Sequence, residues 1–173
     1  SYLISNCLWN PYMSEENYQL LIEEYYRMTY GDGWRYLLEY MDMWIEAGDQ
    51  LGCWLSNFSQ PQEVLSVKYY AENYEKMREL FDKALAMANN SDQQRLIELA
   101  SSHMEFLALC GQYEAQYENG TEEQKAAYTA RYEAFYNILK KYNASVGDPS
   151  IPATAEITAN PMKMYYNIDT IEP

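Results

Sequence analysis

The side chains best suited to catalysis in this sequence are its single histidine and one of its cysteines. His103 and Cys110 stand seven residues apart, a spacing that places both on one face of a helix. A nucleophilic thiol needs access to its substrate, and the residues around this pair form an apolar stripe that would bury both. We therefore expect His103 to be a core histidine with a hydrogen-bonded ring and Cys110 to be a buried thiol.

The pattern around His103 does not favour a metal centre. A di-iron bundle needs a glutamate three residues before its histidine ligand, and that position holds Ala100. Zinc sites need several histidine or cysteine ligands, but Cys7, Cys53 and Cys110 lie far apart and form no Cys-x-x-Cys pair. The sequence thus predicts no metal, no cofactor and no catalytic residue in this chain.

Paired acidic residues and one glycine-rich stretch are the remaining candidates for chemistry. The pairs that begin at Glu15, Glu23 and Glu122 fall at helix starts or on outward faces, whereas acid–base catalysis needs carboxyl groups that face each other across a cleft. Gly31-Asp32-Gly33-Trp34 could hold an anion at a helix N-terminus, but it lacks a phosphate-binding lysine, and Asp32 repels phosphate. We expect this stretch to be a turn between two helices.

The segment Trp9-Asn10-Pro11 is the most distinctive local motif. Pro11 disfavours a helical conformation at Asn10 and pushes it toward an extended one. Two interpretations remain. In the first, Asn10 and Trp9 point into a neighbouring binding site. In the second, which we favour, both residues only set the geometry of the connection between two elements.

The charge of the chain limits its partners. Its 173 residues include 26 acidic and 12 basic side chains, which give a formal net charge of −14 at pH 7. So negative a surface repels phosphate groups, which argues against nucleic acid and anionic membranes as partners. The sequence has no apolar run of about 18 residues, so we expect no membrane span.

Periodic apolar residues between turn signals predict about five amphipathic helices. Capping residues mark four of the expected helix starts: Ser14, Ser66, Ser91 or Asp92, and Thr121, which forms a capping box with Gln124. The remaining helix is expected from Trp34 to about Gly48, followed by an apolar loop at residues 51–61 with Trp54 and Phe58 packed inward.

The fold class predicted from these elements is all-α, an antiparallel bundle of about five helices with an N-terminal strand and an extended C-terminal tail. The strand is expected at Tyr2–Leu8, and because it has no partner, residues 1–13 are interpreted as the remnant and linker of a larger unit. Residues 14–145 form the bundle. Residues 146–173, rich in proline and threonine, are expected to pack on it as the tail.

Tyrosine is unusually frequent, with 19 residues against 4 phenylalanines. Exposed rings can stack on sugars, but buried rings with a hydrogen-bonded or wet hydroxyl are equally ordinary. Six tyrosines fall on inward stripes and are expected in the core or at its edge: Tyr18, Tyr25, Tyr70, Tyr74, Tyr128 and Tyr142. The doublets at 25–26, 69–70 and 165–166 turn one ring to another face, and those rings remain candidates for binding.

The beginning of the chain resembles a known family over the stretch YLISNCLWNPYMSEENYQLLIEEYYRMTYGDGWRYLLEYMDMW. The order Leu8-Trp9-Asn10-Pro11, an acidic helix and Tyr30-Gly31 is similar to a domain-of-unknown-function family of bacterial glycoside-hydrolase-like proteins, distantly similar to alpha-glucuronidases. In that family this order joins the last strand of a barrel to a helical domain. The resemblance extends over about residues 2–142 and is strongest over the first 45.

The resemblance implies a non-catalytic C-terminal domain of a glycoside-hydrolase-like enzyme that is exported or displayed at the surface of a bacterium. Its main partner would be the missing N-terminal barrel of the same protein, with a carbohydrate or a second copy of the chain as further partners. Four residues would reach the edge of the active cleft: Trp9, Asn10, Tyr30 and Trp34. A self-standing helical module that binds a protein or a carbohydrate is the alternative.

Overall fold

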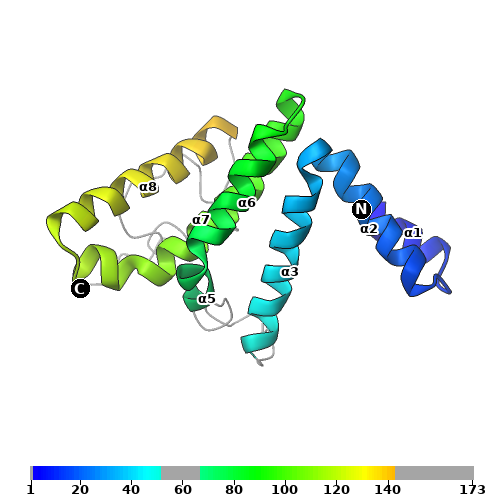
Figure 1. Ribbon diagram of the computed structural model, residues 1–173, viewed down its shortest axis with the longest axis horizontal. Helices are drawn as coiled ribbons and strands as arrows, with labels where there is room; N and C mark the ends of the chain where they lie inside the picture. Colours follow the sequence, from blue (N-terminus) through cyan, green and yellow to red (C-terminus); the bar gives the residue numbers. More distant parts are fainter. Residues whose placement is uncertain (1, 52–66, 143–173) are drawn as a thin grey trace.

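The computed structural model describes residues 2–51 and 67–142, and every element in these ranges is helical (Figure 1). The elements are α1 (Tyr2–Trp9), α2 (Glu15–Tyr30), η1 (Gly31–Gly33), α3 (Trp34–Leu51), α5 (Val67–Glu72), α6 (Tyr74–Ala86), α7 (Ser91–Gln112), η2 (Tyr113–Glu118) and α8 (Glu122–Tyr142). The prediction of an all-α helical bundle is confirmed. The expected loop at 51–61, with Trp54 and Phe58, and the expected tail at 146–173 lie outside the described residues.

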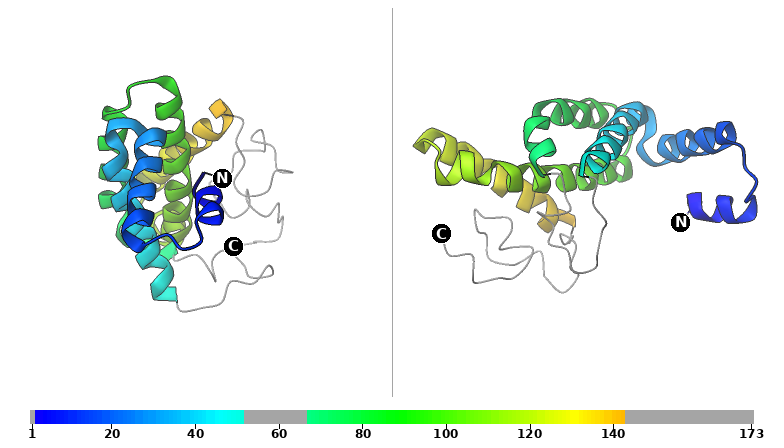
Figure 2. Two further views of the ribbon diagram at one scale, coloured as in Figure 1. Left: turned by 90° about the vertical axis from the view of Figure 1, so that its right-hand side faces the viewer. Right: turned by 90° about the horizontal axis from the view of Figure 1, so that it is seen from below.

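Helix α7 is the centre of the arrangement, because α2, α5, α6 and α8 all pack against it. Helix α3 packs between α2 and α6. The α1–α2 hairpin lies at one end of the molecule, and η2 with the start of α8 lies at the other, which makes the fold elongated (Figure 2). The two ends therefore expose different surfaces.

The expected strand at Tyr2–Leu8 is wrong, since these residues belong to helix α1. A strand needs a neighbouring strand for its backbone hydrogen bonds, and the described ranges contain none, whereas a helix satisfies most of its own. Helix α1 lies against α2. The Tyr2 ring stacks on Tyr25 with centroids 6.3 Å apart, and the Tyr2 hydroxyl donates to Glu24 Oε2 at 3.0 Å.

The signals at both ends of α2 act as the sequence predicts. Ser14 Oγ accepts a hydrogen bond from the Asn17 amide at 3.3 Å, which confirms the N-cap. The helix ends at Gly31, whose φ of 65° lies in the region that favours glycine. Asp32 Oδ2 then accepts from Asn89 Nδ2 at 2.9 Å and joins this turn to the α6–α7 connection. The stretch is thus the expected turn between helices.

The start of α7 and the extent of the preceding helix differ from expectation. The N-cap of α7 is Asn90, not Ser91 or Asp92, and Asn90 Oδ1 accepts from the Gln93 amide at 2.9 Å. An asparagine caps as well as a serine does, so the sequence alone left one position of ambiguity.

The helix expected to run on from Ser66 is broken at Asn73 into α5 and α6. Asn73 Nδ2 donates to the Tyr69 carbonyl at 3.0 Å, the kind of local bond that competes with regular helix. The break lets α5 cross α7 closely at Gly111, where an added Cβ would overlap the carbonyl oxygen of Val67.

The capping box at the start of α8 is confirmed and provides a stability prediction. Thr121 Oγ1 accepts from the Gln124 amide at 3.3 Å, while Gln124 Oε1 accepts from the Thr121 amide at 2.8 Å. Thr121→Ala is expected to lower the free energy of unfolding by about 1 kcal/mol, measured by urea denaturation. Thr129→Ala, in the middle of the same helix, is the control and should change it by less than about 0.5 kcal/mol. Equal losses would contradict the capping role.

The tyrosine prediction is confirmed in part. Tyr70 and Tyr128 are fully buried, whereas Tyr18 is exposed because it faces away from the bundle. Three more lie half-buried at the core edge: Tyr25, Tyr74 and Tyr142. Two doublet partners expected on other faces, Tyr26 and Tyr69, are buried as well, because a second element covers each of them. Tyr69, for example, donates its hydroxyl to Glu46 Oε2 on α3 at 2.7 Å.

Candidate functional site

An aromatic cavity of about 290 Å³ lies between α2, α3 and α7. Three helices supply its lining at helical spacing, so each presents one stripe to the same space. We call it the aromatic cavity and define it by its lining residues: Tyr26, Tyr30, Leu37, Tyr40, Met41, Trp44, Ala100 and His103. The helices enclose it because α2 and α3 meet at the sharp Gly31–Gly33 turn and both lean on α7.

The rings of the cavity contact one another in pairs. On α2, the Tyr26 and Tyr30 ring centroids lie 5.4 Å apart at an interplanar angle of 50°. Across the cavity the Trp44 and His103 rings meet edge to face, with centroids 6.2 Å apart. His103 also meets the Tyr70 ring edge to face at 6.4 Å. These contacts hold the side chains in place, so the cavity is largely preformed.

The cavity has an exposed rim and a buried polar group at its inner side. Trp44 is 47% exposed, whereas Tyr40 is only 9% exposed. The hydroxyls of Tyr40 and Tyr70 are both buried, and they interact with each other. Burial raises the pKa of Tyr40 and of Tyr70, so both stay protonated at neutral pH.

The described part of the lining carries no formal charge, since none of its residues is Asp, Glu, Lys or Arg. Packing of the imidazole against Trp44 and Tyr70 removes part of its water and lowers the pKa of His103, so the ring is neutral at pH 7. The Asp42 carboxylate acts on the lining from outside it, and adds to burial and neighbouring tyrosines in raising the pKa of Tyr26. The cavity is thus aromatic and uncharged, inside an acidic protein.

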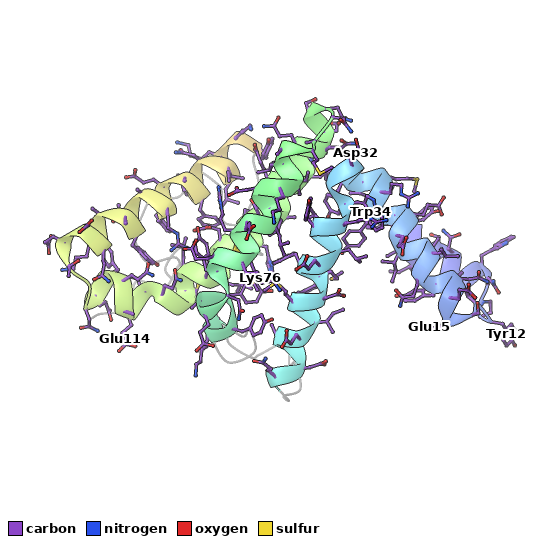
Figure 3. The ribbon with its side chains drawn as sticks, viewed as in Figure 1. Tyr12, Glu15, Asp32, Trp34, Lys76 and Glu114 are labelled. Carbon is purple, nitrogen blue, oxygen red and sulfur yellow. The ribbon has the colours of Figure 1, made fainter. Side chains whose placement is uncertain are left out.

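The structure does not bring the four sequence-predicted site residues together. Tyr30 lines the aromatic cavity. Trp9 and Asn10 lie beyond the opposite end of α2, a helix whose 16 residues span about 24 Å. Trp34 is buried, with the guanidinium groups of Arg27 and Arg35 at 5.2 and 5.1 Å from its ring, so it acts in packing. Figure 3 shows Trp34 at the η1 end of α2, far from Tyr12 and Glu15.

The end of the α1–α2 hairpin exposes a group of large apolar side chains. We call this group the apolar tip: Ile4, Leu8, Trp9 and Tyr12. Trp9 is 92% exposed and Tyr12 is 94% exposed, and Figure 3 shows Tyr12 at the outer end of the hairpin. Helix α1 contributes no buried residue, so its apolar side chains serve no core within the described part of the chain.

A buried ion pair lies in a second pocket between α6, α7 and α8. Arg131 Nη2 and Nε lie 2.8 and 2.9 Å from Glu105 Oε1, and Arg131 Nη1 donates to Gln112 Oε1 at 2.7 Å. The guanidinium carbon also lies 3.8 Å from the Tyr74 ring centroid. Its bonds go to neighbouring side chains, so the pair joins α7 to α8 and is best explained as structural.

The paired thiol and imidazole do not form a catalytic unit. Seven residues along α7 separate the Cα atoms of His103 and Cys110 by about 10.5 Å. Burial raises the pKa of Cys110 to about 12, so the thiol is protonated at neutral pH. The expectation of a core histidine is wrong, since His103 is exposed at the aromatic cavity. Helical periodicity predicts that His103 faces the core, but the buried face of α7 is centred one residue further along the chain, at Ile97 and Met104.

The sequence analysis named Tyr30 as a site residue, His103 as a candidate for chemistry and one ring of the Tyr25-Tyr26 doublet as a candidate for binding. It did not bring these residues together with Tyr40 and Trp44. A signal was present, since Leu37, Tyr40, Met41 and Trp44 follow helical spacing with two large aromatic rings. Such a stripe normally indicates core. Only the placement of α2 and α7 shows that it faces a cavity.

Comparison of the chain with protein-family models, with curated proteins and with solved structures gives no match in any of the three. The family resemblance, the barrel partner and the exported parent therefore stay predictions. None of the described helices combines the length and apolar character needed to cross a bilayer. No three acidic, histidine or cysteine side chains in the described ranges come together as a metal site.

Proposed function

We propose that the chain is a non-catalytic helical domain that supports a neighbouring domain of the same protein by packing against it through the apolar tip. On the family resemblance, that neighbour is the barrel of a bacterial glycoside-hydrolase-like protein. The observation that carries the proposal is the near-complete exposure of Trp9 and Tyr12 beside Leu8 and Ile4. Exposed apolar patches of this kind mark interaction surfaces, and buried Trp and Tyr residues often dominate their energetics.

The ionisable groups of the described residues are consistent with a supporting role. The Glu105–Arg131 pair is internally neutralised, and Cys110 is protonated. An acid–base mechanism of glycoside hydrolysis needs two carboxyl groups flanking one bond, and the barrel would have to provide them. In this proposal the chain stabilises the barrel by packing against it and lies at the edge of the barrel's active-site cleft.

The test compares the longer native open reading frame with this chain, using aryl glycosides and uronic-acid-capped xylo-oligosaccharides as substrates. The longer protein is expected to turn over a substrate that this chain leaves intact. Trp9→Ala should destabilise the longer protein by about 2 kcal/mol, since its ring would leave a buried interface. In this chain alone the change should be below about 0.5 kcal/mol, because the ring is already exposed.

Met87→Ala, at an exposed position just after α6, is the matched control and should be silent in both forms. Equal effects of Trp9→Ala in the two proteins would rule out docking through the apolar tip. If no barrel-encoding sequence lies upstream, the proposal fails, and a self-standing module becomes the better explanation. Oligosaccharide binding by this chain alone would point to a carbohydrate-binding module.

A further inference from the structure

The aromatic cavity has features of a ligand site that the supporting role does not use. Its volume of about 290 Å³ lies at the lower end of the ~300–1,000 Å³ typical of ligand pockets, so its occupant is small. Rings and an imidazole from three helices face this space. The cavity lies at the η1 end of α2, away from the apolar tip, so the two surfaces can be tested separately.

The electrostatics of the lining favour a cation without hydrogen-bond donors. Ring faces carry partial negative charge, and a cation held against several of them is stabilised. No charged side chain lines the cavity among the described residues, the Asp42 carboxylate is nearby, and the protein carries a net charge of −14. A primary ammonium would lose its hydration without finding carboxylate acceptors, whereas a methylated ammonium needs none.

Other ligand classes fit less well. The hydroxyls of a sugar need several acceptors and donors, usually carboxylates and amides, and the described lining offers only tyrosine hydroxyls and one imidazole. An anion would meet ring faces and a negative protein without a compensating cation.

We propose that the aromatic cavity binds a small quaternary ammonium compound, with its methylated head against the rings of Tyr26, Tyr30 and Trp44.

Three probes separate the charge from the shape. Choline and tetramethylammonium carry the methylated cation, and 3,3-dimethyl-1-butanol is the uncharged isostere of choline. Titrations of the full chain would be followed by NMR, through the indole N–H signal of Trp44, and by calorimetry. Choline is expected to bind about tenfold more tightly than the isostere, since the isostere keeps the shape but loses the attraction to the rings.

Variants of the full chain localise the site. Trp44→Leu is expected to weaken choline binding about tenfold and to fold normally, because the side chain is half exposed. Trp9→Leu makes the same substitution at the apolar tip and should leave binding unchanged.

Several results would overturn the proposal. Equal affinity for choline and its isostere would make the cavity an apolar site, and the absence of choline binding at millimolar concentration would remove the cation site. An unchanged affinity in Trp44→Leu would place binding elsewhere, as would a loss in Trp9→Leu. Binding of methyl xyloside in place of choline would assign the cavity to sugars.

Discussion

Arg131→Met is expected to lower the free energy of unfolding by about 3 kcal/mol, because it leaves the Glu105 carboxylate buried without its counter-ion. Glu105 is buried on α7, and both of its short contacts to Arg131 involve the same oxygen, Oε1. The substitution also removes the bond to Gln112 and the stacking on Tyr74. Urea denaturation of the variant and the natural chain gives the difference.

A double-mutant cycle distinguishes the pair from general packing. Glu105→Leu combined with Arg131→Met should recover most of the loss, since no unpaired charge then remains. Lys83→Met, which breaks an exposed pair with Glu79, is the control and should produce no measurable change. If the double variant is as unstable as Arg131→Met alone, the buried charge is not the cause.

Gly111→Ala is expected to destabilise the protein by about 2 kcal/mol, although alanine is the better helix former. The added methyl group would overlap the Val67 carbonyl and touch Ala71, so α5 would have to move away from α7. Gly48→Ala is the same substitution on α3 at a site where none of the described residues lies within 4 Å of the new Cβ. It should stabilise the protein by about 0.5–1 kcal/mol through helix propensity alone.

Thermal unfolding of both glycine variants tests the close crossing directly. Opposite shifts of the melting temperature are expected from two chemically identical substitutions. A stabilising Gly111→Ala would mean that α5 does not approach α7 as closely as the structure shows.

The parts of the fold that could be predicted are those decided within a few residues. Ser14 and the Thr121–Gln124 pair cap helices through bonds that reach three positions along the chain, so their sequence signals suffice. The inward position of Tyr128 on α8 was likewise predicted from helical spacing, and this tyrosine is fully buried. For Tyr2–Leu8, a short apolar run fits a strand or a helix equally well, and the contact with α2 decides in favour of the helix.

The candidate site could not be assembled from the sequence, because it depends on how three helices meet. Tyr26 and Tyr30 line the same cavity as Trp44 because the chain turns at Gly31 and because α2 packs against both α3 and α7. The pairing of the Tyr40 hydroxyl with Tyr70 is also a property of the assembled interior, and no spacing rule reports it. The position of His103 could not be predicted for the same reason. The buried face of α7 is centred one residue later than the sequence pattern indicates, so His103 lines the cavity and does not lie in the core.

Helix α1 has a consequence for the energetics of association. It has eight residues, none of them buried, and isolated helices shorter than about 12–15 residues are marginal in water. Its persistence therefore depends on α2, through contacts such as Tyr2 with Tyr25 and Glu24, and its amides should exchange with solvent at a small fraction of the global unfolding free energy. A partner that covers the apolar tip would order a locally melting segment, so part of its binding energy would be consumed in folding α1 and the complex would form more weakly than its contact area suggests.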